Sequence, residues 1–252
     1  FDLQNPQQQS FAAKWLPLAQ GDITENEFIV PFAEIEPFDE IAIEDLIRFV
    51  ERPLKFFFER RLGVYFREED EQIADHENFQ LSGLDNYSLN NQLLDLSEEE
   101  FDDFFTRQAI KGILPRGGFA SVYAEKTIKQ VQEFKNKIAD YRALEPAHED
   151  IDLELAGEFG TFRLTGQLSS LLGEQKQCVI WYFANDKERY RVRPWIYYLL
   201  QLQHREDVPT PLLFVKDKAN PIGFKSISKE EALFQLKIYL DGFCRAAYQP
   251  LP

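Results

Sequence analysis

The chain has 252 residues, of which 44% are hydrophobic, so it is long enough to bury a full core. Its net charge of −15 argues against a generic polyanion binder, because the mean field of the chain repels DNA and only local basic patches can attract it. No apolar run approaches the roughly 18 residues of a membrane span, and two cysteines without a C-x-x-C spacing favour a reducing cytoplasm.

The N-terminal part of the chain divides into a lead-in and a helical part. Residues 1–40 are rich in Gln, Pro and Glu and are expected to be a lead-in segment, and the start at Phe1 is typical of a fragment of a longer protein. Residues 41–148 are predicted to be mainly helical. A helix from about Glu44 breaks at Pro53, since proline cannot continue it, and Pro53 begins a second short helix.

Start and stop signals indicate further helices in this part. Ser97-Glu98-Glu99-Glu100 is a capping box, in which side chains satisfy the free amides at a helix start, and the helix that follows is predicted to stop at Gly112. A long helix is predicted from about Ala120 to Leu144, because its apolar residues recur at helical spacing. A short helix is expected within Leu81–Leu96, after an acidic loop at residues 67–80.

The pattern changes at about residue 149, where apolar and polar residues begin to alternate. Residues 149–252 are predicted to form an α/β core with a small mixed sheet, and a single compact domain over 41–252 is the alternative division. The predicted strands are 151–155, 159–168, 178–184, 211–215 and 222–227. A helix is predicted to open at Arg193-Pro194-Trp195, and the last helix begins at a second capping box, Ser228-Lys229-Glu230-Glu231.

The sequence shows none of the familiar catalytic or cofactor motifs. His76, His148 and His204 are far apart, and none has a partner at the spacing of a metal site. There is neither a glycine-rich phosphate loop nor a dinucleotide fingerprint. Ser169-Ser170 lies in no nucleophile elbow. No cofactor and no metal are therefore expected.

One stretch, Phe162–Asn185, reads as two adjacent buried strands joined by a polar turn. It resembles the strand pair of PD-(D/E)xK nucleases, in which the first strand ends in Gly-x-Ile-Asp and the second reads apolar-apolar-Asp-x-Lys. In that family the carboxylates hold Mg²⁺, which activates water and stabilises the scissile phosphate. The corresponding segments of this chain are Leu164–Ser169 and Val179–Phe183.

Every charged group of that nuclease pattern is replaced in this chain. Ser169 stands in the place of the first acid, Trp181 in the place of the second, and Phe183 in the place of the lysine. Hydroxyl and aromatic groups cannot supply a carboxylate site for a hard cation, so we expect these three residues to line one site without metal. The alternative is an active metal-dependent nuclease with displaced acids, for which Asp186 and Glu188 are the nearest candidates.

Other stretches carry a longer resemblance. Asp45–Val64, Phe79–Leu94 and Ile113–Phe119 are similar to the C-terminal part of the exodeoxyribonuclease V gamma subunits, the RecC family. This resemblance implies a catalytically dead nuclease fold in a non-catalytic bacterial subunit of the RecBCD helicase-nuclease, which acts in double-strand break repair and homologous recombination. It also implies contacts with RecB-like helicase-nuclease and RecD-like helicase subunits, and a role in splitting duplex DNA and guiding single strands.

Candidate DNA contacts come from net-basic segments of the chain: Arg48, Arg60, Arg61, Lys111 and Arg116. An ordinary solvated role is the alternative for each of them. Three functions are therefore weighed: a DNA-guiding scaffold without enzyme activity, an active nuclease, and a protein-binding module with no DNA contact.

Overall fold

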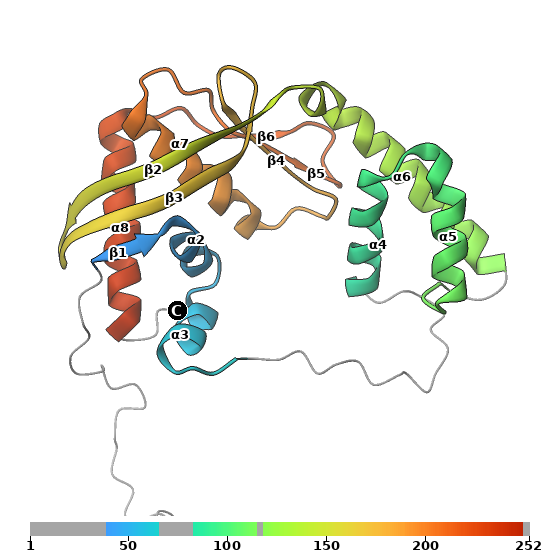
Figure 1. The fold of residues 1–252 in the computed structure, drawn as a ribbon, viewed down its shortest axis with the longest axis horizontal. Helices are drawn as coiled ribbons and strands as arrows, with labels where there is room; N and C mark the ends of the chain where they lie inside the picture. The colour runs from blue at the N-terminus through green and yellow to red at the C-terminus, as the bar shows by residue number, and fades with distance from the viewer. Residues whose placement is uncertain (1–38, 66–82, 115–117, 249–252) are drawn as a thin grey trace, which may run out of the picture.

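The structure is a computed structural model, and it describes residues 39–65, 83–114 and 118–248 (Figure 1). The lead-in, the acidic loop 67–80 and Arg116 lie outside the described residues. The strands are β1 (Glu40–Ala42), β2 (Pro146–Gly157), β3 (Gly160–Leu172), β4 (Gln177–Tyr182), β5 (Leu212–Val215) and β6 (Ile222–Gly223). The helices are α2 (Ile43–Glu51), α3 (Pro53–Arg61), α4 (Gly83–Asp95), α5 (Phe101–Ile110), α6 (Gly118–Arg142), α7 (Val192–His204) and α8 (Lys229–Tyr248), with 3₁₀ turns at Glu98–Glu100 and Glu188–Arg191.

The described strands form one mixed sheet in the order β1-β3-β4-β5-β6, with β2 paired to β3. β2 and β3 make a long antiparallel hairpin, while β1 pairs parallel to β3 and β4 pairs parallel to β5. A mixed α/β class with a small mixed sheet and helices before it is thus confirmed. Among the described helices, none is both long and apolar enough to cross a membrane.

Local signals in the sequence place several helix ends correctly. Pro53 occupies the first turn of α3, directly after α2 ends. The carboxylate of Glu100 accepts hydrogen bonds from the backbone amide and the hydroxyl of Ser97, each at 2.8 Å, and the capping box is confirmed. Gly112 has a φ of +72° just beyond α5, a conformation that favours glycine and ends the helix there.

Strand β4 is covered on both faces, as its continuous apolar run predicts. Cys178 and Ile180 face the main core, which packs the sheet against α2, α7 and α8 and includes Leu164, Tyr197 and Leu236. Val179 and Trp181 face a second core, which packs the sheet against α4, α5 and α6 and includes Phe105, Phe134 and Phe214. In Figure 1 these helices form a group on the side of the sheet away from α8.

Strand β3 contains an irregularity close to the predicted site. Leu168 pairs with Glu149 and Leu171 with Ala147, so β3 has one residue more than β2 between these pairs. Ser170 has a φ of +60°, which absorbs the extra residue as a bulge. Leu168 and Leu171 consequently both face the main core, although strict alternation would send them to opposite faces.

Candidate functional site

Phe183 lies just beyond β4 and is only 1% exposed. Its ring packs edge-on against Phe134 of α6, with 5.2 Å between ring centroids. Trp181 is half-buried and packs against the same second core. The structure therefore brings together two of the three residues that are predicted to stand in the place of the nuclease motif, and it places them among apolar side chains.

A lysine from another strand lies at the same place. The ammonium of Lys216, directly after β5, is 5.4 Å from the centre of the Phe183 ring, within the range of a cation–π contact. Its Nζ is also 3.5 Å from Oε1 of Gln130 on α6. Sequence reasoning missed this cation because only the parallel pairing of β4 with β5 brings Lys216 beside Phe183.

Ser169 has a different environment from Trp181 and Phe183. It is exposed, and it belongs to the β3 bulge rather than to the second core. That the three positions line one site stays a prediction.

Asp186 and Glu188, the acids of the active-nuclease alternative, differ in their surroundings. Oδ2 of Asp186 accepts a hydrogen bond of 2.7 Å from the Arg191 guanidinium, and the backbone amide of Asp186 donates to Oδ1 of Asp217 at 2.7 Å. Glu188 is exposed at the start of the following 3₁₀ turn. Across residues 39–65, 83–114 and 118–248, no group of three or more His, Cys, Asp or Glu side chains is arranged to hold a metal ion.

The structure separates the predicted DNA contacts. Arg48 of α2 and Arg60 of α3 both pair with Asp45, and the Arg48–Asp45 distance is 3.7 Å. Lys111 is exposed at the end of α5, in the helical group that lies apart from α2 and α3 in Figure 1. The backbone of Arg61 ends α3, whereas its side chain and the whole of Arg116 lie outside the described part.

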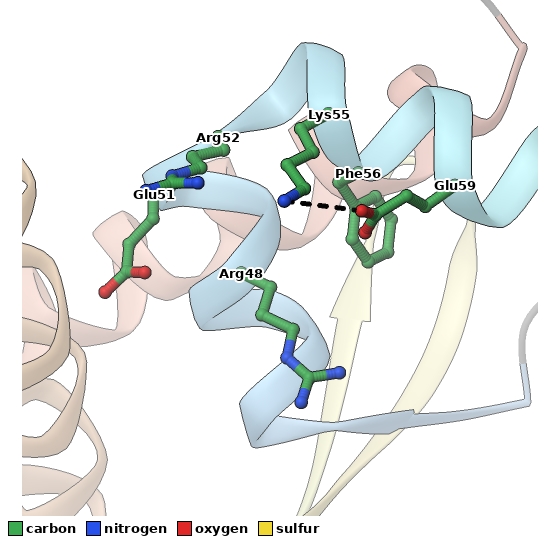
Figure 2. Close-up of a pocket in the computed structure, with 6 residues that line it drawn as sticks. All are labelled: Arg48, Glu51, Arg52, Lys55, Phe56 and Glu59. Carbon is green, nitrogen blue, oxygen red and sulfur yellow. Dashed lines mark ion pairs between the residues drawn. The ribbon is translucent and has the colours of Figure 1, made fainter. Parts of the chain in front are cut away.

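Arg48 belongs to a pocket between α2 and α3 with a volume of about 230 Å³. The pocket is lined by Arg48, Glu51, Arg52, Lys55, Phe56 and Glu59 (Figure 2). Arg52 and Lys55 were not among the predicted contacts. Their signal in the sequence is the recurrence of bases on either side of Pro53, and both line the pocket because the chain turns between α2 and α3 there.

The charges around this pocket do not cancel evenly. Lys55 forms an ion pair with Glu59 at 3.5 Å, one helical turn further along α3. Burial raises the pKa of Glu51, while the cations of Arg193, Arg189 and Arg52 oppose that rise. Three basic side chains and two carboxylates line the pocket, so it keeps an excess of positive charge.

A bidentate ion pair fixes α2 against α7 beside this region. The Arg193 guanidinium donates to the two carboxylate oxygens of Glu44 at 2.5 and 2.7 Å and to the Tyr197 hydroxyl at 3.0 Å. The hydrogen bond from Arg193 lowers the pKa of Glu44, although partial burial opposes the shift. Arg193, in the first turn of α7, therefore joins the two helices.

We expect a double-mutant cycle of Glu44→Gln and Arg193→Gln to give a coupling of about 1 kcal/mol at pH 7. The value is modest because the Glu44 side chain is 48% exposed. The lowered pKa of Glu44 means that the coupling is present above its unfolded pKa and is lost as pH falls through the lower folded value. Urea unfolding of the four proteins at pH 7 and pH 3 measures it, and a coupling that grows on acidification contradicts this assignment.

Comparison with known proteins identifies the family. The family model described as the RecC C-terminal domain matches residues 38–252. The chain belongs to the RecC C-terminal domain family. The resemblance of the sequence to the RecC family is thereby confirmed.

Two relatives show how far the similarity to RecC extends. The chain is 46% identical over 244 residues to the RecBCD enzyme subunit RecC of Haemophilus influenzae, covering 94% of this chain and 21% of that protein. It is 29% identical over 258 residues to the RecBCD enzyme subunit RecC of Escherichia coli K12, covering 100% of this chain and 22% of that protein. The chain thus spans about a fifth of the length of these RecC relatives.

Proposed function

We propose that this RecC C-terminal domain is a non-catalytic scaffold of a RecBCD-type helicase-nuclease in bacterial double-strand break repair. In this role it contacts RecB-like and RecD-like subunits in the cytoplasm and helps to split duplex DNA and guide the single strands. The family membership supports a RecBCD subunit role, since the two relatives carry the name RecBCD enzyme subunit RecC. Its core is a PD-(D/E)xK-like fold over residues 149–252, preceded by a helical part over residues 41–148.

The observation that carries the non-catalytic role is the burial of Phe183. A nuclease of the PD-(D/E)xK type needs a solvated lysine and metal-bound carboxylates at these strand positions. Here Phe183 is packed against Phe134, and Trp181 contributes to the same core. A metal ion with its waters would have to displace these side chains and the helix α6 that covers them.

Contacts between residues 41–148 and residues 149–252 support the alternative of one compact domain over 41–252. β1 pairs with β3, and its residue Ile41 joins the main core. Ile138 of α6 joins the second core together with Val179 of β4. Limited proteolysis tests the division: one compact domain predicts that no stable fragment begins near residue 149.

A cleavage assay tests the proposed function against the active-nuclease alternative. The purified chain is incubated with linear duplex and single-stranded DNA in the presence of Mg²⁺ or Mn²⁺, and no cleavage is expected. Metal-dependent cleavage that survives stringent purification and disappears in an Asp186→Asn/Glu188→Gln variant would establish a nuclease with displaced acids. Lys187→Gln is the matched control, since it changes the same exposed loop without removing an acid.

Charge reversal separates DNA guiding from a pure protein-binding role. Arg60, Arg61 and Lys111 are replaced together by Glu in the full-length protein assembled with its partner subunits. Weaker binding of DNA ends is expected, because each substitution replaces a cation that can neutralise a phosphate by an anion that repels it. Unchanged end binding in a complex that still assembles would favour a protein-binding module. Co-purification of the full-length protein with a helicase-nuclease and a second helicase tests the scaffold role itself.

A further inference from the structure

We propose that the pocket between α2 and α3 binds the backbone of single-stranded DNA, with Arg48, Arg52 and Lys55 contacting neighbouring phosphodiester groups. This inference rests on the proposed DNA-guiding function and names the place where a strand is held. Figure 2 shows Arg52 and Lys55 near the junction of the two helices and Arg48 further back on α2, with their charged ends directed to different places around the pocket. They come from both sides of the break at Pro53, so the turn between the helices creates the site.

The two arginines are available to a ligand. The side chain of Arg48 is 71% exposed, and its partner Asp45, at 3.7 Å, is also bound by Arg60. Arg52 is exposed, and no described carboxylate forms an ion pair with it. A guanidinium presents a planar fork of donors that matches two oxygens of a phosphate, so each arginine can bind a phosphodiester without breaking a strong internal pair.

The two carboxylates of the pocket do not cancel its positive charge. Glu59 is engaged by Lys55 at 3.5 Å, a distance typical of a weak exposed helical pair. Glu51 has its pKa raised by burial, and the charged groups that act on it include the cations Arg193, Arg189 and Arg52. Because three basic side chains and two carboxylates line the pocket, a phosphodiester meets more positive than negative charge here, although the chain as a whole carries −15.

The size and walls of the pocket favour a backbone phosphate over a complete nucleotide. Its volume of about 230 Å³ lies below the range of roughly 300–1,000 Å³ typical of sites for drug-sized molecules. Phe56 forms an apolar wall and is held by ring contacts with Phe49 and Phe243, at 5.9 and 5.1 Å between centroids. A flexible single strand can bend its backbone into such a recess, whereas duplex DNA is stiff on this scale.

Photo-crosslinking in the assembled complex tests the pocket. The full-length protein with its partner subunits is bound to forked DNA whose single strands carry 4-thiothymidine, and crosslinked peptides are identified by mass spectrometry. Crosslinks to residues 43–61 are expected, and they should fall at least fivefold in an Arg48→Gln/Arg52→Gln variant. The slope of log affinity for single strands against log salt should flatten by about 1.4, the value for two lost contacts.

The matched control is Lys225→Gln/Lys229→Gln, which removes the same charge from exposed residues before and at the start of α8. Crosslinks elsewhere in the domain but none within 43–61 would overturn the pocket and leave the guiding function intact. No crosslink anywhere in the domain would overturn both. Crosslinks from the pocket to a partner subunit in place of DNA, detected with an amine-reactive reagent at Lys55, would make it a protein interface and also overturn the proposal.

Discussion

Replacing Phe183 by alanine is expected to lower the free energy of unfolding by about 3–5 kcal/mol, the usual loss for a buried Phe. Phe183 is 1% exposed, so truncation leaves a cavity between β4 and α6 and removes the contact with Phe134. The loss of the Lys216 cation–π contact adds to the cost. Urea denaturation followed by circular dichroism measures the effect. A decrease of this size in the free energy of unfolding is expected of a side chain that packs in the core, and not of one that serves catalysis.

Ser169→Ala is the matched control, because Ser169 is the other end of the replaced motif and is exposed. Its free energy of unfolding should stay within about 0.5 kcal/mol of the parent value. If Phe183→Ala were as mild as Ser169→Ala, Phe183 would not be part of the core and the packing account of this site would be wrong.

Gly166→Ala is expected to lower the free energy of unfolding by about 1–3 kcal/mol, because it forces a residue with a side chain into a strained backbone conformation. Gly166 lies in β3 with a φ of +148°, a region that residues with a Cβ rarely adopt. An added Cβ would also lie 3.3 Å from Cδ1 of Ile43, where α2 crosses the sheet. The loss should appear as a lower urea midpoint with an unchanged slope.

Gly223→Ala provides the control, since a Cβ at Gly223 has no atom within 4 Å. That protein should be as stable as the parent or slightly more stable, because alanine restricts the unfolded chain. Equal effects at Gly166 and Gly223 would contradict the strained position assigned to Gly166.

Much of the helical part could be predicted from short-range signals. Pro53, the Ser97 capping box and Gly112 each act through the backbone within one helical turn, and each sets a helix end in the structure. The apolar run from Cys178 likewise predicts a strand that is buried on both faces. These features are visible in the sequence because their causes are local.

Other features of the fold depend on long-range pairing and could not be predicted. β1 has three residues, and its strand form rests on parallel pairing with β3 far along the chain. The predicted strand over 222–227 is only Ile222–Gly223 in the structure, because its pairing with β5 is that short. The bulge at Ser170 could not be predicted, because nothing in the dipeptide Ser169-Ser170 indicates a residue with a positive φ.

The candidate site could be predicted only in part, because it too depends on contacts between segments far apart in the chain. The resemblance to the nuclease strand pair predicts that Phe183 stands in the place of a lysine, but the sequence does not show that α6 covers Phe183 or that Lys216 lies over its ring. Likewise, Arg48 could be proposed from its basic neighbourhood. Its grouping with Arg52 and Lys55 appears only once α2 and α3 are folded against each other.

A manganese titration followed by NMR tests most directly whether packed side chains fill the position that corresponds to the metal site of PD-(D/E)xK nucleases. Bound Mn²⁺ broadens signals of nearby nuclei, so the indole signal of Trp181 and the ring signals of Phe183 report on this position. The account predicts that both stay sharp at one equivalent of Mn²⁺. Saturable, selective broadening of Ser169, Trp181 and Phe183 at that ratio would place a metal ion there and contradict it.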